Sequence, residues 1–241
     1  MKKKYKILAV VSARGGSKGI PGKNLKKLNK RPLLSYTLKT LLEVKDINKI
    51  VVSSDSEKIL NYAKNFSNKI EINKRPKYLA RDKTPLMSVV KYVALEQLKK
   101  NYEADYVLQI APTCPFIKVN TYNKIISLLK KGKECVVTLK RIEHEHPYRA
   151  KELNVKKNLF RSFIKNKNVE SFISRQDLPT LYCTSGAVYA KTLKLLKKFN
   201  EKDFNFGKKP AGVIVDDFEA VNIDRYIDFD LAELISKKYN K

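Results

Sequence analysis

Short apolar runs alternate with amphipathic segments along most of this 241-residue chain, and this alternation limits the possible folds more than any other feature. The apolar runs predict strands at Ile7–Val11, Ile50–Ser53, Tyr106–Ile110, Cys135–Leu139, Ala187–Ala190 and Gly212–Val215. The amphipathic segments predict helices at Leu33–Leu42, Ser56–Asn65, Leu86–Lys99, Val119–Leu129 and Phe229–Lys238. Because strands that alternate with helices usually pair in parallel, the pattern predicts an α/β fold with a doubly wound, mainly parallel sheet.

The region from about Arg141 to Tyr182 interrupts this alternation. It is polar, and its segments LFRSFI (residues 159–164) and ESFISR (residues 170–175) have the composition of strands. We therefore expect an inserted arm at roughly 141–182 and not a second domain, so that residues 1–241 form a single domain.

The first predicted strand runs directly into a loop rich in glycine and cations, within the string LAVVSARGGSKGIPGKNL (residues 8–25). Arg14, Lys18 and Lys23 supply three side-chain charges, and four glycines allow close backbone approach to a ligand. A loop of this kind after a buried strand is typical of a polyphosphate site, because phosphoryl transfer requires charge neutralisation. The alternative is a solvated basic turn. The spacing matches neither G-x-x-x-x-G-K-[ST] nor G-x-G-x-x-G.

The formal net charge of +27 raises the question of nucleic acid, but only nine of the 51 Lys and Arg residues are Arg. Since Arg makes most bidentate contacts to bases and phosphates, scattered lysines indicate a solvated surface that collects small anions, without nucleic acid as a partner. Three widely spaced cysteines predict no disulfide framework, which fits a cytoplasmic protein. No apolar run reaches the length of a membrane span, so we expect no membrane partner.

Several polar residues are expected at one edge of the sheet, because ligands of doubly wound sheets bind beyond the carboxyl ends of the strands. This rule places Ser12–Asn24, Ser53–Asp55 and Ala111–Pro115 together. Asp55 is interpreted as the N-cap of the helix that follows it. Asp224 precedes a predicted helix that begins with acidic residues. The sequence of this segment is equally consistent with Mg²⁺ binding by Asp224 and with acidic residues that only cap the helix.

Several strings of this sequence resemble the motifs of the sugar-acid cytidylyltransferases, the CMP-sialic acid synthetase family (acylneuraminate or nonulosonate cytidylyltransferases). The most specific is SARGGSKGIPGKN at residues 12–24. The others are SSDSEKILNYAK (53–64), RPKYLARD (75–82), LQIAPTCPF (108–116), EHEHPYR (143–149), SRQDLPTLYCTSGAVYA (174–190) and VNIDRYIDFDLAE (221–233). The resemblance covers nearly the whole chain.

The resemblance implies a Rossmann-like sheet, a protruding arm that forms a homodimer, and a defined reaction. The anomeric hydroxyl of a 2-keto-3-deoxy nonulosonic (sialic-type) acid attacks the α-phosphorus of CTP, pyrophosphate leaves, and the CMP-sugar enters surface-glycan synthesis. By the same resemblance, Lys23 and Arg14 are catalytic, with Lys23 on the α-phosphate and Arg14 with Lys18 on the β- and γ-phosphates. The implied nucleotide site is completed by Gly15, Gly16, Ser17, Asn24 and Arg75. The implied sugar site consists of Gln109, Arg149, Gln176, Ser185 and Tyr189, and the implied Mg²⁺ ligands are Asp224 and Asn222.

Two positions depart from the family pattern. Asn222 stands in place of the first aspartate of the metal motif, and since an amide brings no negative charge we expect weaker Mg²⁺ binding. Ser185 stands where the family often has asparagine, which leaves the sugar open. The alternatives are a Kdo-type cytidylyltransferase, which uses an eight-carbon sugar acid, and a CTP-binding protein with impaired turnover.

Overall fold

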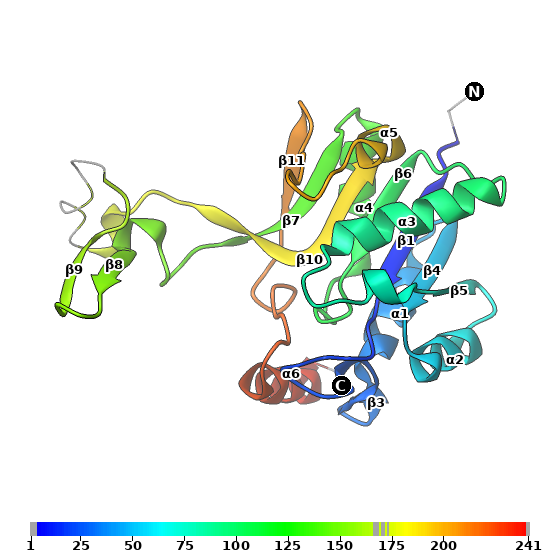
Figure 1. Cartoon of the computed structure of the whole chain (residues 1–241), viewed down its shortest axis with the longest axis horizontal. Coiled ribbons are helices and arrows are strands. Elements are labelled where there is room, and N and C mark those ends of the chain that lie inside the picture. The colour runs from blue at the N-terminus through cyan, green and yellow to red at the C-terminus, as the bar shows by residue number, and fades with distance from the viewer. Residues whose placement is uncertain (1–3, 166–168, 170–171, 173, 240–241) are drawn as a thin grey trace.

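The computed structural model describes residues 4–165, 169, 172 and 174–239. Its main strands are β1 (Ile7–Ser12), β4 (Lys49–Ser54), β5 (Ile70–Lys74), β6 (Tyr106–Ile110), β7 (Cys135–Arg141), β10 (Tyr182–Thr192) and β11 (Pro210–Ile214). They form one sheet in the order β11-β7-β10-β6-β1-β4-β5 (Figure 1). Only β10 runs antiparallel to its neighbours in this sheet, β6 and β7. The predicted α/β fold with a mainly parallel, doubly wound sheet is confirmed.

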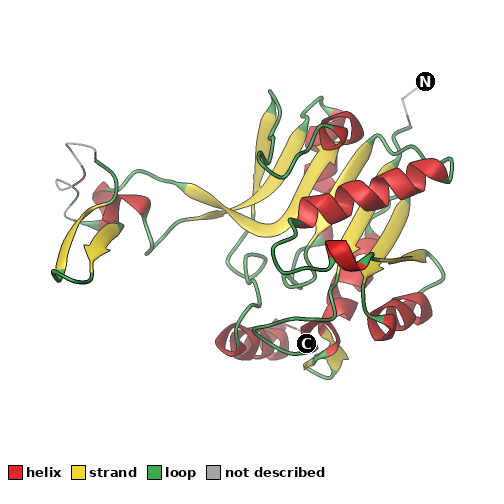
Figure 2. Ribbon diagram, in the orientation of Figure 1, coloured by secondary structure: helices red, strands yellow, loops and turns green. Residues whose placement is uncertain are grey.

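Helices cover both faces of the sheet (Figure 2). They are α1 (Leu33–Glu43), α2 (Glu57–Phe66), α3 (Leu86–Lys99), α4 (Val119–Lys130), α5 (Leu193–Lys197) and α6 (Tyr226–Tyr239). Along β1, Ile7, Ala9 and Val11 pack with α1, α2 and α4, whereas Leu8 and Val10 pack with α3 and α5. Because β1 is buried on both sides, its sequence is continuously apolar and does not alternate.

Four short strands were not predicted from the sequence, and one of them, β8 (Lys151–Asn154), lies outside the main sheet with its partner β9 (Leu159–Ser162). Strand β5 lies at one edge of the sheet, and its isoleucines alternate with Glu71 and Asn73, so it lacks an apolar run. Strands β2 (Lys27–Leu28) and β3 (Arg31–Pro32) form a two-residue hairpin beneath α6. Edge and hairpin strands bury little surface, which leaves a weak sequence signal.

The chain between β7 and β10 leaves the sheet as an arm (Figure 1). The arm carries the turn η3 (Pro147–Arg149), the hairpin of β8 (Lys151–Asn154) and β9 (Leu159–Ser162), and the turn η5 (Arg175–Asp177). The strand predicted within LFRSFI is therefore confirmed as β9. Most of the predicted segment ESFISR lies outside the described residues, as do 166–168.

The parallel strands β1, β4 and β6 end at the same edge of the sheet. The glycine-rich loop follows β1 and the turn η1 (Lys23–Leu25) closes it, while the segment Ala111–Pro115 follows β6. This edge is therefore where the fold places the residues of the predicted polyphosphate site. Among the helices that the structure describes, none is both long and apolar enough to cross a bilayer.

Candidate active site

A pocket of about 430 Å³ opens at this carboxyl edge, beside the glycine-rich loop. It is lined by Ser12, Arg14, Ser17, Lys18, Gly19, Lys23, Asn24, Arg75, Leu86, Ala111, Pro112, Thr113, Gly186, Asn222 and Asp224. The fold therefore brings together every residue predicted for the nucleotide or the metal except Gly15 and Gly16, which lie in the same loop outside the lining.

The loop is fixed by its own hydrogen bonds and by contact with the segment before α6. The side-chain amide of Asn24 donates to the carbonyl oxygen of Arg14 at 2.9 Å and ties the ends of the loop together. Gly22 has a φ of +65°, in the left-handed region that favours glycine. A Cβ atom on Gly19 would lie 2.2 Å from the carbonyl oxygen of Asp224. Glycine at position 19 thus allows the loop to pack directly on the chain that carries Asp224.

Lys23 places a nearly buried ammonium group in the pocket. Its residue is only 8 % exposed, and its Nζ donates to the carbonyl oxygen of Ile223. The same Nζ lies 3.0 Å from Oδ1 of Asp224. Since an ammonium group has three donors and two are used here, one remains for a ligand. The charge is therefore held in place before any phosphate arrives.

Arg75 enters the pocket from the chain that follows β5. Its Nη2 donates to the carbonyl oxygen of Ser53 at 2.8 Å, which anchors the guanidinium. Burial lowers the pKa of Arg75, the carboxylate of Asp55 opposes that shift, and the charge of Arg14 adds to it. A guanidinium buried beside a second cation favours a ligand that accepts hydrogen bonds or carries negative charge.

Three buried polar atoms of the pocket residues have no hydrogen-bond partner: Ser12 Oγ, Asn24 Oδ1 and Arg75 Nε. In the described part of the chain, only one further buried side-chain atom, Thr37 Oγ1 in α1, lacks a partner. Leaving a buried polar atom unpaired costs about 1–3 kcal/mol, so such atoms are few and need an explanation. Three of these four atoms belong to residues of one pocket, where a polar ligand or bound water can supply the missing partners.

Asp224 and Asn222 form the part of the pocket that could hold a metal ion. Oδ1 of Asp224 lies against Lys23, and Oδ2 accepts a hydrogen bond from the Asn222 amide at 2.7 Å. Burial raises the pKa of the Cys114 thiol to about 12, so this group is neutral, and it lies 3.6 Å from Oδ1 of Asn222. No cluster of three or more His, Cys, Asp or Glu suited to a metal occurs within the described residues.

This donor set fits Mg²⁺ in one particular way. Mg²⁺ is commonly held by one or two carboxylates together with phosphate oxygens of the substrate and water. One carboxylate and one amide oxygen meet that requirement if a nucleotide supplies the other ligands.

The interpretation of Asp55 as a helix N-cap is wrong. Ser56 occupies the N-cap position of α2, and Asp55 instead accepts a hydrogen bond from the backbone N–H of Gly15 at 2.8 Å. Asp55 therefore holds the glycine-rich loop from the neighbouring strand. Gly16 lies beyond this contact, and a Cβ atom there would meet nothing within 4 Å.

The predicted sugar residues do not line the pocket, and they lie in two separate regions. Gln109 and Tyr189 are paired across β6 and β10. Ser185 is buried, and its hydroxyl donates to Thr138 Oγ1 at 2.7 Å, beside the irregularity in β10 that brings Gly186 into the pocket. Arg149 and Gln176 lie exposed on the arm.

Sequence reasoning missed several pocket residues. Ser12 was placed at the sheet edge without a role, although a hydroxyl that ends an otherwise apolar strand is a usable signal. Gly19 was assigned only general backbone freedom. No sequence pattern around Leu86 or Gly186 predicts that these residues line the pocket, because only the path of the folded chain brings them there.

A parallel sheet with a cation-lined, glycine-rich pocket at its carboxyl edge defines a nucleotide-binding α/β enzyme. The model of the family described as "Cytidylyltransferase" matches residues 8–211. The chain belongs to this family and is a nucleotidyltransferase.

Individual relatives match along nearly the whole chain. The CMP-N,N′-diacetyllegionaminic acid synthase of Legionella pneumophila is 28% identical over 228 residues, which are 95% of each chain. The pseudaminic acid cytidylyltransferase of Campylobacter jejuni is 29% identical over 96% of this chain and 97% of the relative. The N-acylneuraminate cytidylyltransferase of Escherichia coli is 28% identical over 98% of this chain and 53% of its own. The predicted resemblance to the CMP-sialic acid synthetase family is confirmed.

A solved structure supports the fold. The CMP:2-keto-3-deoxy-manno-octonic acid synthetase superposes with a TM-score of 0.67 over 97% of this chain and 99% of its own. The two sequences are 15% identical, so the likeness concerns the fold alone.

Proposed function

We propose that this protein transfers CMP from CTP to a nine-carbon 2-keto-3-deoxy sugar acid, releasing pyrophosphate and supplying surface-glycan synthesis. The observation that carries the proposal is the pocket itself, which is lined by four cationic side chains and contains three residues with a buried, unpartnered polar atom. The choice of a nonulosonic acid is supported by the relatives, whose names state legionaminic, pseudaminic and N-acylneuraminic acids.

In the proposed complex, the triphosphate of CTP lies along the glycine-rich loop. Lys23 neutralises the α-phosphate, where charge develops as the sugar hydroxyl attacks. Arg14 and Lys18 hold the β- and γ-phosphates that leave as pyrophosphate. Because Ile223 and Asp224 already fix the Lys23 ammonium, little reorganisation is needed in the transition state.

The remaining nucleotide contacts follow from the orphaned atoms. Arg75 Nε donates to an acceptor of the cytosine base, and Asn24 Oδ1 accepts from a nucleoside hydroxyl. Ser17 and the exposed backbone of Gly16 support the phosphates, while Gly15 is held back by Asp55. These assignments would give two of the three unpaired atoms of the pocket a partner that CTP carries.

Asp224, with Asn222 beside it, is proposed to hold Mg²⁺. The ion would polarise phosphate oxygens and stabilise the negative charge of the leaving pyrophosphate. Asp224 serves both sites, because one carboxylate oxygen faces Lys23 and the other faces Asn222.

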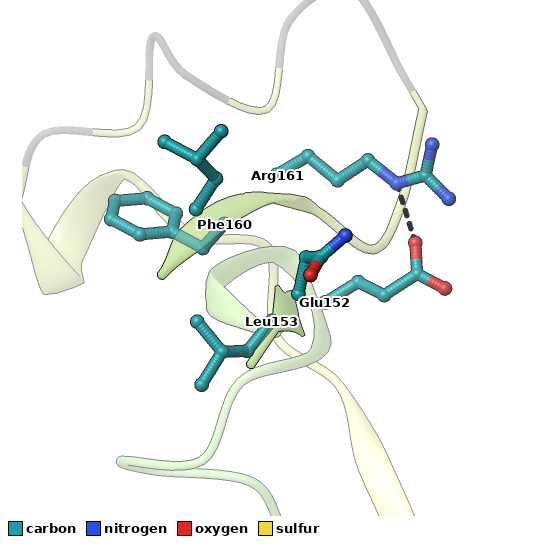
Figure 3. Close-up of a pocket in the computed structure, with 6 residues that line it drawn as sticks. Glu152, Leu153, Phe160 and Arg161 are labelled. Atoms are coloured by element: carbon teal, nitrogen blue, oxygen red, sulfur yellow. Dashed lines mark hydrogen bonds and ion pairs between the residues drawn. The ribbon is translucent and has the colours of Figure 1, made fainter. Parts of the chain in front are cut away.

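The sugar acid is proposed to bind between the sheet and the arm of a second copy in a homodimer. Leu153 and Phe160 of the hairpin lie on the side opposite the ion pair of Glu152 with Arg161 (Figure 3). Leu153 and Phe160 are 56% and 70% exposed, and exposed apolar faces of this kind mark interaction surfaces. Dimerisation through this hairpin would bring Arg149 and Gln176 of one copy toward Gln109 and the pocket of the other.

We also propose that residues 1–241 act as one cytidylyltransferase domain in the cytoplasm, without a nucleic-acid or membrane partner. The match of relatives to 95% or more of the chain supports a single unit. The scattered lysines and the scarcity of arginine support the absence of a nucleic-acid role.

A CTP-binding protein with impaired turnover is the second candidate function. It is favoured by the hydrogen bond from Asn222 to Asp224, because that bond occupies a carboxylate oxygen that the metal needs.

The test is pyrophosphate release from CTP and Mg²⁺ with N-acetylneuraminate, N,N′-diacetyllegionaminate, pseudaminate or Kdo, against a reaction without sugar. Release with a nine-carbon acid is expected and would identify the substrate. Release with Kdo alone would establish the eight-carbon alternative. CTP binding without release from any of the four would favour impaired turnover.

A further inference from the structure

Asp82 bridges two cations of the glycine-rich loop from a distant part of the chain. Its Oδ1 lies 2.7 Å from Nη1 of Arg14, and its Oδ2 lies 2.7 Å from Nζ of Lys18. Asp82 belongs to the turn between η2 (Lys77–Leu79) and α3, which follows the buried Arg75. One carboxylate therefore connects two segments that face the same pocket.

The single carboxylate of Asp82 offsets part of the positive charge of Arg14 and Lys18, the two cations that the proposed function assigns to the β- and γ-phosphates. Arg14 and Lys18 both line the pocket, whereas Asp82 lies outside the lining. The Lys18 ammonium and the Arg14 guanidinium hold the pKa of Asp82 below its usual range, so the carboxylate is charged near neutral pH. A triphosphate entering this pocket meets cations that already have an anionic partner.

We propose that Asp82 competes with the phosphates of the substrate for Arg14 and Lys18. Its ion pairs with these two side chains form a latch that the phosphates displace. The proposal rests on the proposed function, because it takes the β- and γ-phosphates of CTP as the displacing group. In the free protein the latch holds both side chains beside the pocket. When CTP binds, phosphate oxygens replace the carboxylate on both cations. After the transfer step, Asp82 competes with pyrophosphate for the same donors and favours its release.

The exposure of the three groups makes such an exchange feasible. The side chains of Arg14, Lys18 and Asp82 are 33%, 77% and 46% exposed, so the carboxylate can return to water when it is displaced. Exposed ion pairs are weak, each changing an equilibrium by a factor of a few. Lys23 differs, since its partners are fixed and its site is nearly buried.

The opposite role makes the opposite prediction. If Asp82 only held Arg14 and Lys18 in the binding geometry while they bound phosphate, removing its charge would loosen both side chains and weaken binding. If Asp82 competes with phosphate, removing its charge frees both cations and strengthens binding. The direction of the change in affinity therefore decides between the two roles.

The experiment measures Kd for inorganic pyrophosphate and for CTP by calorimetry, without sugar and at fixed ionic strength. We expect Asp82→Asn to bind both ligands roughly threefold to tenfold more tightly than the original protein, from the loss of two exposed ion pairs. In turnover, KM for CTP should fall while kcat stays level or falls, because pyrophosphate leaves more slowly.

The matched control is Asp46→Asn. Asp46 is an exposed carboxylate, 52% accessible and 2.9 Å from Lys130, remote from the pocket lining. It removes the same charge from a protein with a net charge of +27, so it measures the general electrostatic gain. We expect a change in Kd well below that of Asp82→Asn.

Asp82→Ala separates charge from hydrogen bonding, because the asparagine amide can still accept from Arg14. Tighter binding in both Asp82 variants, beyond the control, supports the latch. Unchanged or weaker binding in Asp82→Asn overturns it while leaving the proposed function intact. If the original protein binds neither ligand, the proposed function fails, and the latch fails with it unless Asp82→Asn then binds pyrophosphate.

Discussion

The glycine-rich loop and the arm both connect elements of the sheet, but they differ in how far this chain buries them. In the loop, Ile20, Lys23 and Asn24 are buried, and hydrogen bonds tie the loop to Ile223 and to its own first residue. In the arm, Val155 and Phe163 are 80% and 66% exposed although both are apolar. The loop is held by contacts within this chain, whereas the described part of the arm has an apolar surface that is open to another molecule.

The functional residues of the loop and those of the arm are therefore expected to act in different ways. Residues of the loop act through positions that this chain fixes by itself, so changing them should alter the chemistry of a single subunit. Residues of the arm act through an interface, so changing them should alter assembly and sugar binding while CTP binding persists.

The largest effect is expected from Lys23→Ala, which removes the ammonium assigned to the α-phosphate. We expect kcat to fall on the order of 10²- to 10³-fold, the usual loss of one preorganised donor of charge stabilisation. The fold should survive, because the charged partner left behind, Asp224, is largely exposed to water, and the further loss is one hydrogen bond to the carbonyl oxygen of Ile223. Pyrophosphate release and the far-UV circular dichroism spectrum together test this.

The control for this variant is Lys27→Ala, which removes an exposed lysine of the neighbouring strand β2. Its kcat should equal that of the original protein. Near-normal kcat in Lys23→Ala would remove its assigned role and leave the loop as a passive basic turn.

Next in size is Gly19→Ala, which tests whether the loop needs its contact with the segment before α6. The new Cβ atom would meet the carbonyl oxygen of Asp224 at 2.2 Å, so one backbone must move. A displacement of about 1 Å at the reacting groups costs on the order of 10²-fold in rate. Gly16→Ala is the control, because its Cβ atom meets nothing within 4 Å. Equal kcat/KM in the two variants would show that the contact of Gly19 with the carbonyl oxygen of Asp224 does not affect catalysis.

The predictability of the fold followed burial. Strand β1 is buried on both faces and its apolar run gave its position to within one residue, whereas β5, at the edge, was missed because Ile70 and Ile72 alternate with polar residues. Long amphipathic helices such as α3 were predicted at the positions where they lie. Local sequence reports how much of an element is buried, and edge elements are buried least.

The predictability of the site followed sequence distance. The loop could be recognised because its cations and glycines lie within one short string. The contacts of Asp55 with Gly15 and of Asp82 with Arg14 join residues 40 and 68 positions apart, and only the folded chain brings them together. Arg149 gives the third case, since it lies exposed on the arm and outside the pocket lining, and the proposed function requires a second chain to bring it to a pocket.

A smaller effect is expected from Phe160→Asp in the hairpin of the arm. A charge at this exposed apolar position should weaken the proposed dimer, and we expect KM for the sugar acid to rise roughly tenfold, as for loss of a central interface residue. The Kd of CTP should not change. Sedimentation velocity measures assembly, and calorimetry measures CTP binding.

Ile214→Asp provides the control, because Ile214 is 58% exposed on the edge strand β11, outside the arm. It should leave assembly and the sugar KM unchanged. A monomeric Phe160→Asp protein with the original sugar KM would refute the contribution of a second copy to the sugar site. A Phe160→Asp protein that remains dimeric would show that the dimer interface does not include Phe160.

The smallest effect is expected from Asn222→Asp. This variant tests whether the residues beside the loop bind Mg²⁺ within a single chain. The amide of Asn222 now donates to Asp224, so the free protein is stabilised by a hydrogen bond that Mg²⁺ must replace. A carboxylate at this position cannot donate, and it would face a second carboxylate whose repulsion a divalent cation relieves. The Mg²⁺ concentration for half-maximal rate should therefore fall about threefold to tenfold.

The same substitution should also change thermal stability. Without metal, the Asn222→Asp variant should melt at a lower temperature than the original protein, and Mg²⁺ with CTP should raise the Tm of the variant by more than that of the original protein. If the Mg²⁺ titration and both Tm values match those of the original protein, Asn222 lies outside the metal site and Asp224 alone serves it.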